Sequence, residues 1–583
     1  MFKSISTKVI LSLFASAFLL VACDKSAEED SKATALSSGD TILRYVPADT
    51  PYIFANVAPL PDELMDKLEP KIDRVLQSYQ AILKEVIAAK QTELAAEESG
   101  SEDIQHVNAV VEELMTLLSV EGMREAGMGR ESTAAIYGNG LLPVLRFELS
   151  DGALFDDAMS RLEEQAGHQL PVAKIGDHSY RYFDAAKVRI LFAVLENQAV
   201  LTVVPASSDD AQTSQALGLT LPETNIAEAG ILQDIADEYG FTDHYVGFFD
   251  TSSFLDRFVG QASGPDADLL ALMEHEGPDL SDVCRAEIHD LVGIAPRMLL
   301  GYTNISTDSL ESTVVVEFRD DIAQGLQPLT GAVPGLGGDH GGLMSFGLSV
   351  DVKAARAFVA ARLDAMEATP FECEHLAELQ AGVAGGREAL NQPVPPMAYD
   401  FGGFLAIIDE IEGLDIATQT PPTSIDGRFL LAMDNAQALV SLGTMFSPEL
   451  ASLNLQADGK PVAFDMPQMR AMGVAAFIAL TDDAVAISVG DDAEAQLETM
   501  LSAELVDPAP FLSFSMDAAR YYEFLGEAIA AGKQDQDDGP SPALQAAMNE
   551  LMQAVADVYD RMSVDVRFTD RGMEFVSSVT LKD

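Results

Sequence analysis

The chain has 583 residues, 48% of them hydrophobic, and a formal net charge of −58 at pH 7. This composition excludes a disordered acidic tail, and the length indicates more than one domain. The excess of carboxylates argues against nucleic acid and anionic lipid headgroups as partners, because phosphate binding needs a high density of Lys and Arg.

The first 22 residues have the pattern of a secretory signal peptide. Lys3 and Lys8 precede an apolar run over residues 9–20, which is too short to span a bilayer stably. The run ends in the letters LVAC, with Cys23 last. This ending resembles the lipobox of Gram-negative envelope lipoproteins. The resemblance implies that lipid is attached to the Cys23 sulfur and that cleavage leaves Cys23 as an acylated N-terminus. An ordinary signal peptide, or an uncleaved anchor with a chance cysteine, is the alternative.

The residue after the cysteine bears on location. Asp24 in this place resembles a signal for retention in the inner membrane of Gram-negative bacteria. Several acyl chains anchor a protein stably, whereas one does so only marginally. We therefore expect a lipid anchor on the periplasmic face of the cell envelope, with the inner membrane favoured over the outer. Residues 23–41 are polar and read as a lipidated flexible tether.

A first lobe is expected over residues 42–321. The apolar run YIFANV predicts a strand, and apolar residues three and four apart from Leu64 to Ile87 predict a long amphipathic helix. Pro70 is expected to bend or restart that helix. Further along the chain, alternating apolar residues repeatedly lead through an Asp or Ser to a helical pattern, which predicts strands followed by N-capped helices.

Two stretches of the chain echo each other. FAVLENQAVLTVVPASSDDA at 192–211 and FIALTDDAVAISVGDDA at 477–493 both read as two strands that lead into a helix. Each half of the chain then closes with two strand patterns around a turn, and an Arg-Met pair recurs at Arg297 and Arg561. The shared order of features predicts an internal duplication. Chance similarity among acidic strand–helix units is the alternative.

A Gly- and Pro-rich segment separates the two halves. Residues 322–342 read as a linker, and residues 343–583 as a second lobe. The predicted fold is therefore α+β, with two related lobes. Each lobe is expected to have a mainly antiparallel sheet with helices packed on one face.

Two cysteines remain after Cys23 takes lipid. In the oxidising periplasm Cys284 and Cys373 are expected to form a disulfide, which would clamp one lobe to the other across the linker. Two separate buried thiols are the alternative.

Chemistry-bearing patterns are sparse. The chain lacks the common hydrolase, metalloprotease and nucleotide-binding motifs. Acid–histidine pairs at His178, His244, His275 and His340 read as structural, since neighbours on a strand point to opposite faces. Asp209-Asp210 and Asp491-Asp492 read as acids at helix N-termini. The acidic run at 535–539 lacks the ligand spacing of a calcium loop and permits only weak cation binding. No catalytic residue, metal site or cofactor is expected.

These observations favour a non-catalytic envelope lipoprotein that binds a periplasmic protein or polymer. A ligand carrier with a pocket between the lobes is the first alternative. An enzyme of an unfamiliar class is the second.

Overall fold

The computed structural model describes residues 35–38, 41–96, 101–259, 264–272, 280–413, 422–465, 470, 473–523 and 541–583. The predicted lipidation site Cys23, the sorting residue Asp24, His275 and the acidic run at 535–539 lie outside these residues.

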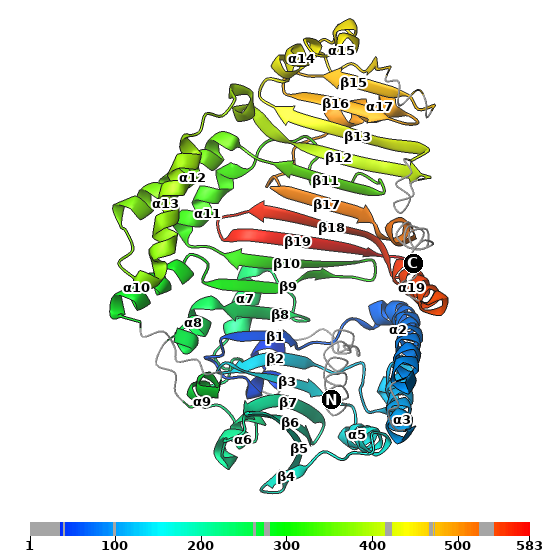
Figure 1. Ribbon diagram of the computed structural model, residues 1–583, viewed down its shortest axis with the longest axis vertical. Helices are drawn as coiled ribbons and strands as arrows, with labels where there is room; N and C mark the ends of the chain where they lie inside the picture. Colours follow the sequence, from blue (N-terminus) through cyan, green and yellow to red (C-terminus); the bar gives the residue numbers. More distant parts are fainter. Residues whose placement is uncertain are drawn as a thin grey trace.

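The described strands join into one 19-stranded sheet (Figure 1). The first half of the chain contributes β1 (Tyr52–Asn56), β2 (Ala134–Asn139), β3 (Leu142–Glu148), β4 (Val172–Ile175), β5 (His178–Ala185), β6 (Val188–Leu195), β7 (Gln198–Pro205), β8 (Val246–Asp250), β9 (Arg297–Ile305) and β10 (Ser309–Glu317). The second half contributes β11 (Met344–Ser349), β12 (Phe401–Glu412), β13 (Ser424–Met433), β14 (Val462–Ala463), β15 (Ala476–Leu480), β16 (Ala484–Val489), β17 (Leu512–Asp517), β18 (Tyr559–Phe568) and β19 (Gly572–Leu581). The mainly antiparallel α+β prediction is confirmed, because these strands pair antiparallel throughout.

The two halves meet at the β10–β19 pair, which we call the seam. Outward from the seam, the first half runs β10, β9, β8, β1, β2, β3, β7, β6, β5, β4. The second half runs β19, β18, β17, β11, β12, β13, β16, β15, β14. The chain therefore fills matching positions in the same order in both halves, with β4 as an additional strand at one edge.

Each half buries one face of its sheet, which we call the covered face. In the first half, Ile53, Val246 and Leu299 lie beneath α7 (Ile231–Tyr239). In the second half, Leu405 and Leu430 lie beneath α17 (Ala493–Leu501). Both helices lie behind the strands in Figure 1. The strands alternate as expected of sheets with one buried face, since successive side chains point to opposite sides.

On the opposite face, which we call the open face, the described helices lie only around the margins. The longest is α2 (Asp62–Ala96), which continues through Pro70 and stands across the strand direction at one end of the strands (Figure 1). The helices α3 (Ser101–Leu117) and α5 (Gly152–Gln165) pack on Phe147 and Ala199, and α14 (Ala436–Thr444) packs on Leu431 and Val485. The prediction that helices pack on one face is therefore wrong.

Further helices lie at the ends of the strands. They are α4 (Val120–Glu125), α6 (Asp210–Ala216), α8 (Thr251–Val259), α9 (Pro265–Leu272), α10 (Asp282–Val292), α11 (Asp320–Leu326), α12 (Val352–Ala368), α13 (Ala377–Asn391), α15 (Pro448–Ser452) and α19 (Pro542–Ala556). Short 3-10 turns are η2 (Ala35–Ser37), η3 (Ile42–Tyr45), η4 (Gln327–Leu329), η5 (Glu374–Leu376) and η6 (Pro396–Tyr399).

Helices also cross between the halves. The first-half helix α2 packs against the second-half helix α19, and its Leu64, Met65 and Leu68 contact Val558 and Leu581. At the other end of the strands, α10 of the first half meets the segment around Cys373 of the second. The halves therefore form one continuous sheet with helices shared at both sides, rather than two separate lobes.

Two predicted segments are more ordered than expected. Leu36 is fully buried in the first-half core, inside the range assigned to the tether. The predicted linker begins within the helix α11, and its Val333 and Leu336 are buried on the covered face of the second half. The polar and glycine-rich composition of these segments predicted no core contact. A few apolar side chains in each segment are nevertheless buried, and this burial holds the segments on the sheet.

Candidate functional site

A row of apolar side chains crosses the open face through both halves. Directly paired residues point to the same face, so the row can be followed strand by strand. Its members, in spatial order, are Phe192, Leu201, Leu145, Ile136, Phe54, Gly247, Leu300, Val314, Phe575, Val566, Leu512, Leu348, Phe404, Leu431 and Val485. Gly247 has no side chain and is buried, and every other residue in this row is half-buried or exposed.

A second row lies two residues along the same strands. From β9 to β13 it consists of Tyr302, Ser312, Ser577, Val564, Phe514, Phe346, Ala406 and Phe429. We call this row, together with the first row from Leu300 to Phe404, the central strip. The strip contains no charged side chain.

Three phenylalanines form the most exposed part of the central strip. Phe346 and Phe429 are each 41% exposed. Both rings contact Phe404 on the strand between them, with centroid distances of 5.7 and 6.0 Å. Such contacts order the rings without removing them from water, so they present a defined apolar surface.

The covered face opposite the strip also buries polar side chains. Thr313, Ser345 and Ser513 are buried there. The Ser345 and Ser515 hydroxyls are 2.8 Å apart. Glu574, also buried, accepts hydrogen bonds from Arg571 at 2.7 and 2.9 Å. Near the seam the sheet therefore buries polar groups and leaves its apolar side in contact with solvent.

That arrangement is unusual for a protein that acts alone. Alternating strands normally turn their apolar side chains to a core, and large contiguous apolar patches mark interaction sites. Within the described ranges, no buried core cluster includes the strip residues from Leu300 to Phe404. The central strip is the strongest candidate for a binding surface.

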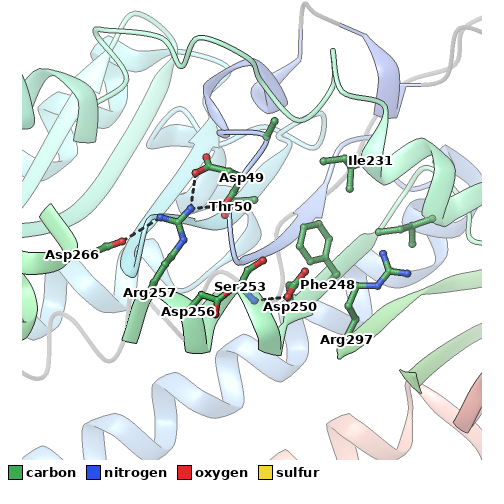
Figure 2. A pocket seen from close by; sticks show the side chains of 12 residues that line it. Asp49, Thr50, Ile231, Phe248, Asp250, Ser253, Asp256, Arg257, Asp266 and Arg297 are labelled. Carbon is green, nitrogen blue, oxygen red and sulfur yellow. Dashed lines mark hydrogen bonds and ion pairs between the residues drawn. The ribbon is translucent and has the colours of Figure 1, made fainter. Parts of the chain in front are cut away.

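A cavity of about 590 Å³ lies at the end of β8, in the first half (Figure 2). Ile231, Ile235 and Phe248 line its apolar side, and Asp250, Asp256 and Arg297 its polar side. A second cavity of about 450 Å³ shares Asp49, Arg257 and Asp266 with the first. All the residues that line these two cavities fall between positions 47 and 297 of the chain. Both cavities therefore lie within the first half and not between the halves.

The charged groups in these cavities are mostly paired with one another. Arg257 donates to the Asp49 carboxylate at 2.6 Å and to Asp266 at 3.3 Å. Arg297 donates to both oxygens of Glu317, at 2.6 and 2.7 Å. Burial and the charge of Asp266 raise the pKa of the neighbouring Tyr52 to about 12, so this phenol stays neutral. Paired arginines bind an added anion poorly, which makes these cavities weaker candidates than the strip.

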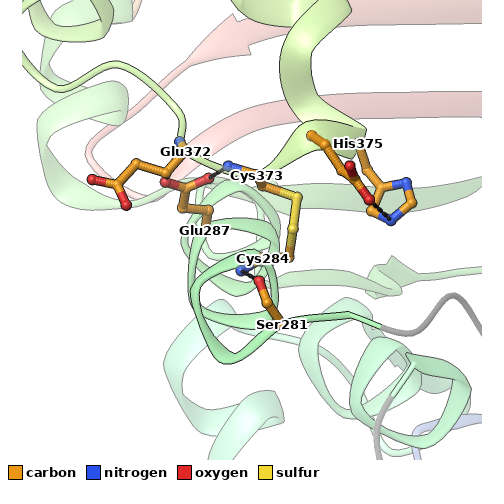
Figure 3. Close-up of a disulfide and its surroundings, with 7 residues drawn as sticks. Ser281, Cys284, Glu287, Glu372, Cys373 and His375 are labelled. Carbon is orange, nitrogen blue, oxygen red and sulfur yellow. Dashed lines mark hydrogen bonds and ion pairs between the residues drawn. A yellow bond between two sulfur atoms is a disulfide. The ribbon is translucent and has the colours of Figure 1, made fainter.

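The structure brings Cys284 and Cys373 together at the side of the sheet (Figure 3). Their Cα atoms are 4.6 Å apart, which is compatible with the expected disulfide. Glu287 adds to this junction, because its carboxylate accepts from the backbone N–H groups of Glu372 and Cys373 at 2.9 and 3.0 Å. The α10 helix is thus joined to the second half by a disulfide and by two hydrogen bonds.

The predicted structural histidines are scattered. His178 lies exposed on β5, and His244 Nδ1 lies 3.3 Å from the Ala58 carbonyl. Burial, followed by the charge of Arg428, lowers the pKa of His340. Its carbonyl oxygen accepts from Arg428 at 3.1 Å, so the glycine-rich segment that contains it is held on the second half.

Acidic residues singled out in the sequence fall at helix starts. Asp209 caps α6 in a reciprocal pair with Gln212. Asp492 occupies the matching position before α17 with φ 54° and makes no side-chain cap. Both echoing stretches therefore form two strands that lead into a helix, but a side-chain cap is present only in the first.

One half-buried acid, Asp426, stands out in the second half. Asp426 Oδ1 is buried without a hydrogen-bond partner. Burial, followed by the charges of Asp409 and Asp491, raises the pKa of its carboxyl group. In the described ranges, no three His, Cys, Asp or Glu side chains are grouped to hold a metal ion.

Comparison with known proteins gives no assignment: no family model, no curated protein and no solved structure matches the chain. Among the described helices, none combines the length and hydrophobicity that a membrane crossing requires.

Sequence reasoning missed the central strip. The signal was present in MSFGLS of β11 and LSFSMD of β17, where large apolar residues alternate with Ser and Gly. That pattern gives one apolar face per strand. It does not say whether the rest of the chain covers the face.

Proposed function

We propose that this protein is a non-catalytic binding protein of the cell envelope, anchored by lipid on Cys23, which captures a protein partner on the central strip. The observation that carries the proposal is the contiguous, uncharged and partly exposed apolar surface around Phe346, Phe404 and Phe429. Surfaces of this kind mark interaction sites in soluble proteins.

Site-specific photocrosslinking tests this role. A photoreactive amino acid at position 346 or 429 is expected to yield a discrete protein adduct in cells that make the lipidated protein. The same group at Leu379, 45% exposed on α13 and away from the strip, serves as the control. Absence of adducts from the strip, or equal adducts from Leu379, would count against the proposal.

The anchor is testable separately. The lipobox-like ending at Cys23 and the tether that follows it support a periplasmic lipid-anchored body. Cys23→Ala is expected to move the protein from the membrane fraction to the fraction that does not sediment with membranes. Substitution of Asp24 is expected to shift the protein from the inner to the outer membrane. Cell fractionation measures both. Unchanged membrane association of Cys23→Ala would contradict the lipid anchor.

We also infer that the two halves arose by internal duplication. Matching strand order supports this, as does the Arg-Met pair that recurs 264 residues apart (561 − 297), in β9 and β18. An experimental structure whose halves superpose strand for strand at this offset near the seam would sustain the inference. A different offset there would refute it.

A further inference from the structure

We propose that the occupant of the central strip is an amphipathic α-helix of a protein partner, apolar on one side and basic on the other. This inference rests on the proposed function and names the class of partner. Four observations support it: the helices already on the same face, the dimensions of the strip, its lack of charge and the acidity of the whole chain.

The open face already binds helices at three of its margins. α3 and α5 cover Phe147 and Ala199 through Leu114, Phe155 and Met159. α14 covers Leu431 and Val485 through Leu439 and Val440.

The third helix, α2, covers the ends of the central strands. Its Leu64, Met65 and Leu68 pack against Leu310 and Val579, which lie on the same face as Val314 and Phe575. Figure 1 shows α2 running across the strand direction. Among the described residues, the strip is therefore an uncovered part of a face on which amphipathic helices pack elsewhere, and one of these helices, α2, runs across the strand direction.

The strip has the dimensions of one helix. Strands lie about 4.8 Å apart, so the strip from β9 to β13 is about 35 Å long. Its two rows are two residues apart, about 7 Å. A helix about 10 Å in diameter covers both rows, and at about 1.5 Å per residue it spans the strip with about 23 residues.

Charge selects the other side of the partner helix. The strip carries no charge, so only the solvent-facing side of a bound helix meets the field of a chain with net charge −58. Exposed acids stand at the strand ends beside the strip, among them Glu410, Glu412 and Asp560. Lysine and arginine on the outer side of the helix are attracted by this field, and glutamate and aspartate are repelled.

Three synthetic 23-residue peptides test the inference on the purified full chain. The first places leucines three and four residues apart on one helical side, with lysines elsewhere. The second has the same composition with leucine and lysine alternating, which favours an extended strand. The third keeps the helical pattern with glutamate in place of lysine. Fluorescence anisotropy at physiological salt measures the three affinities.

The helical lysine peptide is expected to bind at least tenfold tighter than either of the others. Phe346→Asp and Phe429→Asp are each expected to weaken it at least tenfold, because they place a charge in the centre of the contact. Leu379→Asp, at comparable exposure on α13, is the matched control and is expected to leave the affinity unchanged. Phe429→Ser, a smaller disturbance, replaces any aspartate variant whose thermal unfolding shows a loss of fold.

Other outcomes assign the strip differently. Equal binding of the two lysine peptides, or equal loss in Leu379→Asp, would reduce the interaction to net charge and overturn the inference. Tighter binding of the alternating peptide would favour an extended partner, and capture of a fluorescent fatty acid without the helical peptide would favour lipid. Either result would overturn the helix while leaving crosslinking from position 346 to decide the proposed function.

Discussion

Leu299 and Leu300 are neighbours on β9 that point to opposite faces of the sheet. Leu299 is fully buried in the first-half core beneath α7, whereas Leu300 is half-buried in the central strip. Near the seam the contrast extends to chemistry, since the covered face holds Thr313 and Glu574 while the open face holds Val314 and Phe575. The covered face holds the largest core cluster of each half, and we propose that the open face between its marginal helices is available to a partner.

On the covered side of the seam, the buried residues Thr313 and Glu574 reduce the apolar contact between the halves, although Val315 is buried there as well. The union depends instead on strand pairing, on the contact of α2 with α19 and on the junction of Cys284 with Cys373. The largest predicted effect on stability is therefore at the disulfide. Replacing both cysteines by serine is expected to lower the free energy of unfolding by about 4 to 5 kcal/mol, because the bond closes a loop of 89 residues.

Denaturant unfolding of the double serine variant under non-reducing conditions measures this loss. The unsubstituted protein with reductant is the matched comparison and is expected to lose a similar amount. A double variant as stable as the parent would show that strand pairing and helix packing hold the halves without the bond.

The two leucines test the division between the faces. Leu299→Ala is expected to cost about 2 to 4 kcal/mol, since it opens a cavity in a packed core. Leu300→Ala is expected to cost about 1 kcal/mol or less, because water already reaches its side chain. Equal losses in denaturant unfolding would mean that the open face is as well packed as the covered face.

A smaller effect is expected at Asp426. Its carboxyl pKa is raised in the folded state, first by burial and then by the charge of Asp409, so folding favours the protonated form. Stability contributed by this group is therefore lost as pH rises from the ordinary carboxyl pKa through the raised value. Asp426→Asn is expected to raise Tm by about 1 to 2 °C at pH 7 and to have less effect near pH 4. A Tm difference that grows toward acid would reverse this sign.

The regular elements were largely readable from the sequence. Asp151 and Asp351 cap their helices as the strand-to-helix pattern predicted, and the two echoing stretches form matching strand pairs that lead into helices. Local chemistry decides such features. The sequence could not show whether the halves form separate lobes or one sheet, because the β10–β19 pairing joins residues far apart in the chain.

The proposed binding surface could not be predicted from the sequence either, for a physical reason. Phe346 and Phe404 read as core residues, since alternating apolar side chains normally find a core. The placement of α7 and α17 on the other face leaves Phe346 exposed and Phe404 half-buried. Leu36 and Leu336 are the reverse case: each stands among polar or glycine-rich neighbours, yet each is buried by a long-range contact.

The central claim is that the strip is open in the isolated protein and covered by a partner in the envelope. Footprinting with a photoactivated carbene, read by mass spectrometry, measures the labelling of Phe346 and Phe429 in both settings, with Leu379 as the internal reference. The account predicts strong labelling of both phenylalanines in the purified protein and protection of both in intact envelopes, with Leu379 unchanged. Equal labelling of the phenylalanines in the two settings would contradict it.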